Sequence, residues 1–250
     1  MSSTKSSTTN NKVKILVLGP AKCGKSTITN FLCQTRETPT SKYYPTRPLR
    51  ILETELELEA SKLAPAGDQA NKNKRLVFAG GDSKVRRVQV QCWDLSGSPQ
   101  YQQTWPAVAE GADGIVLLYN SQIPNAAREL SLWYKHFVLN QNEIDGQGNF
   151  AKRVPLSQVL VLAHQSTQPS GDLPEDDEDE LSRNPAAYLK KKLPKELESV
   201  RVLRSSLDYD SDNFKEAFDQ LVQRIIVHRM EVEEEEMLRG EREDKNNRIL

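Results

Sequence analysis

The eight residues GPAKCGKS, at positions 19–26, have the composition and spacing of a loop that binds phosphate groups. An apolar run at residues 13–18 precedes this loop, and a helical pattern at residues 25–34 follows it. In such an arrangement consecutive backbone N–H groups surround the phosphates, and the N-terminal end of the helix adds a partial positive charge. Glycine at positions 19 and 24 lets the backbone come close to the ligand. The pattern predicts a binding site for a nucleoside triphosphate.

Individual side chains of this loop have separate expected roles. The Lys25 ammonium would lie on the β- and γ-phosphates, and the Ser26 hydroxyl would bind the Mg²⁺ ion that bridges them. The residues expected to contact the phosphates are Gly19, Pro20, Ala21, Lys22, Cys23, Gly24, Lys25, Ser26 and Thr27.

Two further motifs favour a GTPase among the proteins that carry such a loop. In WDLSG, at residues 93–97, Asp94 would hold Mg²⁺ through a water molecule, and the Gly97 N–H would contact the γ-phosphate. Thr46 lies 21 residues after Lys25 and just before a strand pattern, where a switch threonine reaches Mg²⁺ and the γ-phosphate only in the triphosphate state. The expected metal site therefore consists of Ser26, Thr46 and Asp94.

The rest of the sequence alternates between strand and helix patterns. Residues 49–58 and 85–92 alternate apolar and polar side chains, which predicts a hairpin with a polar insertion, residues 60–74, at its tip. Continuous apolar runs predict buried strands at residues 114–119 and 158–163, and residues 200–203 would form the last strand. Helical patterns occupy residues 125–140 and 212–230. We therefore predict an α/β fold, with a doubly wound, mostly parallel six-stranded sheet, one antiparallel edge strand, and the ligand at the carboxyl ends of the strands.

Composition is consistent with one well-buried domain and appendages, because the 250 residues are 37% hydrophobic and 28% charged. The net charge of -1 is unevenly distributed: residues 171–181 contain seven acidic and no basic residues, and residues 231–250 contain eight acidic and four basic residues. The remainder carries a diffuse surplus of about ten positive charges. Lysines that bind a triphosphate explain such a surplus better than a nucleic-acid surface does, so no nucleic-acid partner is expected.

Cysteine usage and hydropathy bear on the compartment. Cys23, Cys33 and Cys92 have no CxxC spacing and are expected to be reduced thiols of a cytosolic protein. No apolar stretch approaches the roughly 18 residues that span a bilayer, and neither end carries a lipidation motif. We therefore expect no direct membrane anchor and recruitment through protein contacts.

Four segments in combination resemble the Rab-like small GTPases of intraflagellar transport, a branch of the Ras-like GTPases: YYPTRPLRILE, WDLSGSPQYQQTWPAV, YNSQIPNAARELSLWY and VLAHQST. This resemblance extends over about residues 12–230. It implies a subunit of train complex B that binds GTP or GDP with Mg²⁺ and docks on a coiled-coil heterodimer of two long train subunits. It also implies a location in the cytoplasm and the cilium or flagellum, including the basal body region, and a monomeric state when the chain is isolated.

The resulting domain prediction has three parts. Residues 1–11 form a disordered tail, residues 12–230 form the Ras-like domain with an acidic loop at residues 169–185, and residues 231–250 form a charged extension that is either a frayed helix or a tail.

The sequence departs from the Ras-like pattern at the catalytic position. Ras-like enzymes usually have a glutamine directly after the DxxG motif, and this glutamine orients the attacking water. Here the position holds Ser98, and a serine is too short to reach that water. No residue is assigned a catalytic role, and we expect intrinsic hydrolysis no faster than the roughly 10⁻⁴ per second of unassisted Ras-type proteins.

A second departure concerns the base. The usual Asn-Lys-x-Asp motif pairs a carboxylate with guanine, but residues 163–166 read AHQS, with no carboxylate at that place. Base specificity therefore stays open, with ATP formally possible. The candidate base contacts are His164, Gln165, Ser166, Ser205, Ser206 and Leu207.

Several aromatic residues near these motifs have two possible roles. Tyr101 and Trp105, after the second motif, are either core residues or contacts to a partner. Trp133 and Tyr134 lie at helical spacing and are expected to pack in the core. His164 is expected in a loop near the base, because no metal or nucleophile cluster accompanies it.

The leading hypothesis is a nucleotide-regulated binding module that holds GTP and Mg²⁺ and hydrolyses GTP very slowly. One alternative is a GTPase that cycles with an activator. Another is a constitutive scaffold in which the nucleotide is a folding cofactor. A P-loop kinase is least supported, because the sequence contains no pattern for an acceptor site or a lid.

Overall fold

The computed structural model of the chain describes residues 12–35, 44–59, 85–123, 125–139, 154–165, 185–208 and 211–247. Three predictions concern residues outside these ranges: the tail at residues 1–11, the hairpin insertion at residues 60–74 and the base contact Ser166. The acidic loop, apart from Pro185, also lies outside them.

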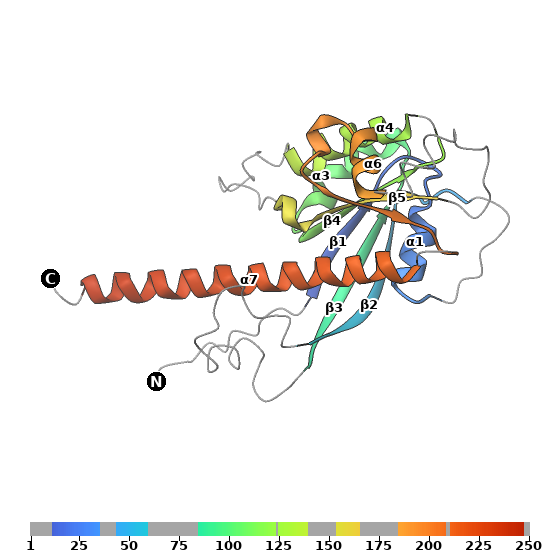
Figure 1. Cartoon of the computed structure of the whole chain (residues 1–250). Coiled ribbons are helices and arrows are strands. Elements are labelled where there is room, and N and C mark those ends of the chain that lie inside the picture. Colours follow the sequence, from blue (N-terminus) through green and yellow to red (C-terminus); the bar gives the residue numbers. More distant parts are fainter. Residues whose placement is uncertain are drawn as a thin grey trace.

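A six-stranded sheet with the order β2-β3-β1-β4-β5-β6 forms the centre of the molecule (Figure 1). All neighbouring strands run parallel except β2, which pairs antiparallel with β3 at one edge. This confirms the predicted sheet with one antiparallel edge strand. The strands are β1 (Lys12–Leu18), β2 (Leu49–Glu59), β3 (Val85–Leu95), β4 (Gly114–Asn120), β5 (Val159–His164) and β6 (Arg201–Ser205).

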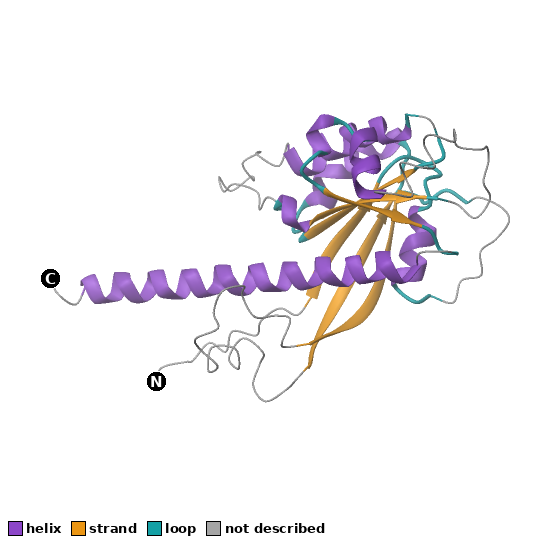
Figure 2. Cartoon of the chain, viewed as in Figure 1, coloured by secondary structure: helices purple, strands orange, loops and turns teal. Residues whose placement is uncertain are grey.

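Helices cover both faces of the sheet (Figure 2). On one face, α3 (Trp105–Ala109), α4 (Ala126–Tyr134) and α6 (Pro185–Lys192) pack in a core that includes Leu16 and Leu117. On the other face, α1 (Lys25–Leu32) and α7 (Ser211–Asn247) pack on Ile15 and Val116. Successive strand residues therefore face opposite helical layers, which explains why the central strands are continuously apolar.

Shorter helical turns complete the fold. They are η2 (Pro99–Thr104), η3 (Lys135–Leu139), η4 (Leu156–Gln158) and η5 (Lys195–Leu197). Of these, η2 leads directly into α3 after the WDLSG segment, and η3 is a π-helical continuation of α4.

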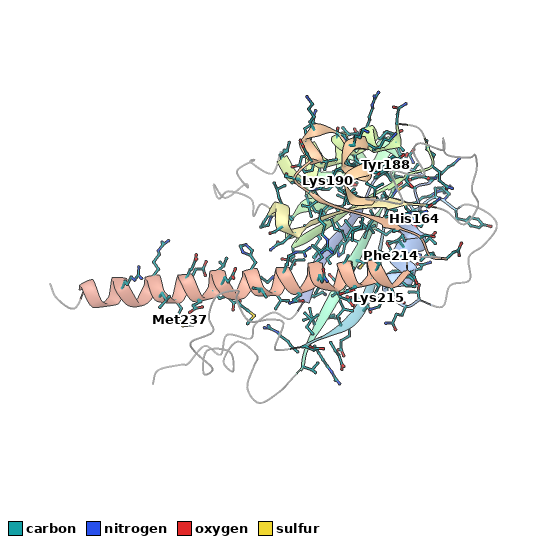
Figure 3. The ribbon with its side chains drawn as sticks, viewed as in Figure 1. His164, Tyr188, Lys190, Phe214, Lys215 and Met237 are labelled. Carbon is teal, nitrogen blue, oxygen red and sulfur yellow. The ribbon has the colours of Figure 1, made fainter. Side chains whose placement is uncertain are left out.

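The α7 helix is longer than the sequence pattern predicted. Its first part packs on the sheet through residues such as Phe214 and Phe218, whereas beyond Met230 the side chains are mostly exposed, with Met237 67% exposed (Figure 3). The helix continues without interruption to Asn247 and projects past the sheet (Figure 1). Although long, α7 is too polar to cross a bilayer, and no other helix in the described ranges is both long and apolar enough.

Candidate nucleotide-binding site

The loop between β1 and α1 has the backbone shape that the glycine spacing predicted. Gly24 caps α1 with a φ of 93° and Gly19 has a φ of 143°, both in a region that side chains rarely allow. A Cβ on Gly19 would lie 2.0 Å from the carbonyl oxygen of Leu118 on β4. Only glycine therefore fits where the chain leaves β1 and turns toward the helix.

Lys25 lies within this loop and is almost fully buried. Its ammonium donates hydrogen bonds to the carbonyl oxygens of Gly19, at 2.9 Å, and Pro20, at 2.6 Å. A positive charge is thus held at the mouth of the loop, beside the backbone groups that would surround phosphates.

The WDLSG segment, which joins β3 to η2, lies directly against this loop. A Cβ on Gly97 would come within 2.3 Å of the Ala21 backbone nitrogen and 2.5 Å of the Pro20 carbonyl carbon. Such a close backbone approach requires glycine at position 97. It places Gly97 directly against Pro20 and Ala21 of the phosphate loop.

The three residues predicted to form the metal site converge from three parts of the chain. The hydroxyl oxygens of Ser26, on α1, and Thr46, just before β2, lie 3.0 Å apart. Asp94, near the end of β3, is completely buried, and neither carboxylate oxygen accepts a hydrogen bond of normal geometry from the described residues. This set of one buried carboxylate and two hydroxyls fits Mg²⁺, which takes oxygen ligands.

The burial of Asp94 changes the pKa of its carboxyl group. Desolvation raises the pKa of the Asp94 carboxyl above its ordinary value, while the nearby Ser26 and Thr46 hydroxyls and the Lys25 and Arg50 cations act in the opposite direction. Among the described residues, no three histidine, cysteine or acidic side chains gather as a metal cluster. A cation at this site would therefore rely on hydroxyl ligands besides Asp94.

Sequence reasoning missed Arg50, which contacts this same set. Its guanidinium approaches Asp94 from β2 at an ion-pair distance of 3.5 Å. The strand pattern contains a signal for it, because Arg50 shares the inward parity of Leu52 and Leu56 rather than that of the outward glutamates.

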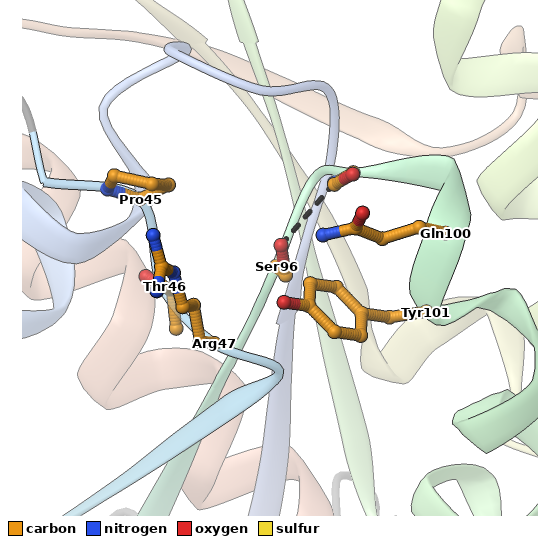
Figure 4. Close-up of a pocket in the computed structure, with 7 residues that line it drawn as sticks. Pro45, Thr46, Arg47, Ser96, Gln100 and Tyr101 are labelled. Atoms are coloured by element: carbon orange, nitrogen blue, oxygen red, sulfur yellow. Dashed lines mark hydrogen bonds between the residues drawn. The ribbon is translucent and has the colours of Figure 1, made fainter.

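A cavity of about 440 Å³ opens between the two predicted switch segments (Figure 4). Its lining comes from both sides: Pro45, Thr46, Arg47, Ser96, Ser98, Gln100 and Tyr101. The Ser98 backbone N–H donates to the Ser96 hydroxyl, at 3.3 Å. The residue at the usual glutamine position is thus a short side chain at the edge of an open space.

The predicted base region lies at the ends of β5 and β6. His164 is the last residue of β5 and is buried, so its prediction as a loop residue was wrong: the strand continues one residue beyond the apolar run. Its Nδ1 lies 3.2 Å from the Ser205 carbonyl oxygen and 3.3 Å from the Ser205 hydroxyl. Its ring also lies against the phosphate loop, because a Cβ on Gly24 would be 2.4 Å from His164 Cδ2.

The other candidate base contacts surround this histidine. The Gln165 backbone N–H donates to the Ser205 carbonyl oxygen, at 2.9 Å, and its side-chain oxygen accepts from Arg204 Nε, at 3.0 Å. Ser206 is buried, and Leu207 packs at the edge of the core below α7. Of the candidate base contacts, His164 lies against the phosphate loop, and Gln165 and Ser205 are joined to each other at the ends of β5 and β6.

The burial of the aromatic side chains decides between their two possible roles. Trp105 is 3% exposed and packs on Trp133, with ring centroids 4.4 Å apart, so it is a core residue. Trp133 and Tyr134 are also buried, which confirms their prediction as packing residues. Tyr101 instead lines the cavity between the switch segments.

Comparisons with known proteins give full-length relatives. No family model matches the chain. It is 45% identical over 234 residues to Intraflagellar transport protein 22 of Trypanosoma brucei brucei, covering 94% of this chain and 95% of that protein. It is 27% identical over 215 residues to the Intraflagellar transport protein 22 homolog of Homo sapiens, covering 86% of this chain and 90% of that protein.

Solved structures match as well. The GTP-bound crystal structure of T. brucei IFT22/74/81 has a TM-score of 0.56 and 39% sequence identity, and the match covers 88% of this chain and 98% of that one. The GDP-bound crystal structure of T. brucei IFT22 has a TM-score of 0.52 and 36% identity, covering 87% and 98% of the two chains. Sequence and structure comparisons thus lead to the same group of proteins.

Proposed function

The chain belongs to the intraflagellar transport protein 22 family, and we propose that it is a Ras-like subunit of the intraflagellar transport machinery that binds GTP and GDP. One observation carries this proposal: the start of α1 with Lys25 and Ser26, the segment before β2 with Thr46, and the end of β3 with Asp94 and Gly97 meet around one loop. That is the arrangement by which a switch protein can respond to a γ-phosphate.

We propose that Mg²⁺ accompanies the nucleotide. Ser26 and Thr46 would supply hydroxyl ligands, and Asp94 would act through water. When bound, the ion would offset part of the negative charge of the phosphates. The backbone of residues 19–27 and the Lys25 ammonium would hold the phosphates, with Gly97 on the γ-phosphate side.

Guanine is the proposed base, since relatives have crystal structures with GTP and GDP bound. His164, Gln165, Ser205, Ser206 and Leu207 are the proposed residues around it, and Ser166 completes the set. The Ser205 and Ser206 backbone would meet the base, and His164 would support the loop from the side opposite the phosphates.

Hydrolysis should be very slow. Ser98 lies where a water-orienting glutamine usually stands, and its side chain is too short to reach across the cavity that it lines. We therefore propose a protein that holds GTP for long periods rather than one that cycles quickly.

We also propose that the ordered switch segments are presented to a coiled-coil heterodimer of complex B. The T. brucei relative has a structure together with IFT74 and IFT81, which supports a partner of that kind. The corresponding location is the cytoplasm and the cilium or flagellum, including the basal body region. The proposed nucleotide-binding domain is residues 12–230, with residues 231–250 as its charged extension.

Identification of the co-purified nucleotide is the direct test. The protein is purified without added nucleotide, its ligand is released by acid, and the ligand is separated by ion-pair chromatography. GTP is the expected product, because hydrolysis is slow. Mainly GDP would support a cycling GTPase, whereas ATP or no nucleotide would contradict the proposal.

Regulation by the nucleotide needs a second experiment. Ser26→Asn should remove nucleotide and reduce partner capture in a pull-down, because the metal ligand is lost. Ser157→Asn, at an exposed position on η4, is a matched control that should bind nucleotide and partner normally. Equal capture by Ser26→Asn and the wild type, with nucleotide loss verified, would favour the constitutive scaffold.

A further inference from the structure

Arg50 connects three elements around the metal site. It is the second residue of β2, and its side chain is 29% exposed. One guanidinium nitrogen, Nη2, donates to the Ser26 carbonyl oxygen, at 3.2 Å, and to Asn30 Oδ1, at 2.5 Å, both on α1. The Nε atom lies 3.5 Å from Asp94 Oδ2. The edge strand that follows Thr46 is thus tied to α1 and to the end of β3.

The position of Arg50 matters because the Asp94 carboxylate is completely buried. A carboxylate without solvent is costly unless a cation or hydrogen bonds compensate it. The Lys25 ammonium also acts on Asp94, but the carbonyl oxygens of Gly19 and Pro20 engage it, and it is the cation expected to contact the phosphates. Arg50 is held beside Asp94 by its contacts to α1, and a planar guanidinium suits such a fixed position better than a flexible ammonium does.

We propose that Arg50 is a positioning residue that offsets the charge of Asp94 and thereby keeps the phosphate pocket intact when Mg²⁺ is scarce. This inference rests on the proposed nucleotide and Mg²⁺ binding. Arg50 approaches the Asp94 carboxylate from β2, and a Mg²⁺ ion held by Ser26, Thr46 and Asp94 would act on the same carboxylate.

The consequence is a weak dependence of nucleotide release on Mg²⁺. Withdrawal of the metal leaves Asp94 facing the phosphates, and two negative groups in a buried pocket repel each other. In the wild type, Arg50 reduces this repulsion. In Arg50→Gln, the contribution of Arg50 is lost and, of the two cations, Lys25 alone opposes the repulsion, so release should accelerate strongly only after the metal is removed.

The test is the dissociation rate of GDP carrying a methylanthraniloyl fluorophore, measured with excess Mg²⁺ and again with EDTA. For Arg50→Gln, the ratio of the EDTA rate to the Mg²⁺ rate should exceed the wild-type ratio by about tenfold or more. Arg87→Gln is the matched control, because Arg87 lies on β3 and pairs with exposed Glu57, at 3.1 Å. Its ratio should equal that of the wild type.

A double-variant cycle separates an effect through Asp94 from general damage. In an Asp94→Asn background, Arg50→Gln should leave the ratio unchanged, because the charge to be offset is gone. Thermal melting without nucleotide gives an independent measurement: Arg50→Gln should lower the melting temperature more in the wild-type background than in Asp94→Asn.

Each remaining outcome has a distinct meaning. If the wild type binds the fluorescent GDP but Arg50→Gln and Arg87→Gln have the same ratio, the inference is overturned and the proposed function stands. Additive effects of Arg50→Gln and Asp94→Asn on melting also overturn it. If the wild type binds no guanine nucleotide, the proposed function fails and this inference fails with it.

Discussion

The backbone of Gly97 lies so close to Ala21 that a single added carbon would approach the Ala21 nitrogen to 2.3 Å. The second motif and the phosphate loop are therefore in direct backbone contact. An atom added to Gly97 would meet backbone atoms, which cannot rotate away as a flexible side chain can. This contact fixes how the segment that leads to the cavity meets the phosphate site.

Gly97→Ala should disrupt this contact. The added methyl group must push two backbone segments apart, so we expect nucleotide affinity to fall at least about tenfold and the free energy of unfolding to drop by about 1–3 kcal/mol. Equilibrium binding and urea unfolding measure the two effects. Gly240→Ala, where nothing lies within 4 Å of the added carbon, should leave affinity unchanged. Wild-type affinity in Gly97→Ala would show that the loop tolerates displacement.

Ser98→Gln should speed hydrolysis. The longer side chain enters the cavity lined by Thr46 and Tyr101 and can orient a water molecule, so we expect a rise of about tenfold or more in the single-turnover rate. Ser98→Leu has a similar bulk without the amide and should give no rise. Equal rates in the two variants would mean that the serine is not what limits hydrolysis.

Stability should depend on pH through His164. Burial lowers the pKa of its imidazole, and the hydrogen bond with the Ser205 backbone opposes this shift. Because the folded-state pKa is below that of the unfolded chain, the stabilisation is complete above the ordinary value of about 6.5 and is lost as the pH falls through the folded-state pKa.

The urea midpoint of the wild type should therefore drop between about pH 7.5 and about pH 5.5, and His164→Gln should show a smaller drop. His228→Gln, on α7, should retain the wild-type difference. An equal drop in the urea midpoint of the wild type, His164→Gln and His228→Gln would assign the pH dependence to other groups.

Trp105→Ala should destabilise the domain by about 3–5 kcal/mol, because a buried indole that contacts Trp133 and Phe137 is removed. Trp105→Phe should cost much less, since it keeps most of the ring and removes a buried N–H that lacks a hydrogen-bond partner in the described structure. Trp93→Ala is the comparison. Trp93 is only half-buried and is covered by the Lys14 ammonium, 3.7 Å from the ring centroid, so about 1 kcal/mol is expected. Chemical denaturation measures all three.

Deletion of residues 231–250 should change the free energy of unfolding by about 0.5 kcal/mol or less, because the described side chains beyond Met230 are mostly exposed. A deletion from residue 221 onward removes Leu221, Ile225 and Ile226 from the core and should prevent stable folding. A large loss from the shorter deletion would show that the extension contributes to the domain. Thermal melting of both truncated chains distinguishes these results.

Strong periodicity made much of this fold predictable. The continuous apolar runs of β4 and β5 reflect burial on both faces of the sheet. The alternation in β2 and β3 reflects burial on one face. By contrast, α3 has five residues, too few to show a helical period, and α6 contains three consecutive lysines that hide its buried Tyr188 and Leu189. Short or charged elements are held by tertiary contacts that a local pattern does not contain.

The site was predictable where spacing dictates geometry. Ser26 and Thr46 could be assigned from their spacing, and their hydroxyl oxygens lie 3.0 Å apart. Arg50 was missed because a charged residue in an alternating strand is usually taken to face solvent. Trp105 could not be assigned either, since the aromatic residues that bury it, Trp133 and Phe137, come from α4 and the π-helical turn after it.

The position of α7 has a consequence for synthesis. Val13 and Ile15 of β1 are made about 200 residues before Phe214 and Leu221 of α7, yet the four residues share a core, and Arg229 donates to the Lys12 carbonyl oxygen, at 2.9 Å. At about 5–20 residues per second, a ribosome needs roughly 10–40 s to deliver that helix after β1. Throughout this interval α1 is the helix that covers this face of the sheet, and the apolar surface that α7 later buries stays exposed. We therefore expect the nascent chain to expose apolar surface that chaperones can bind until α7 has been made.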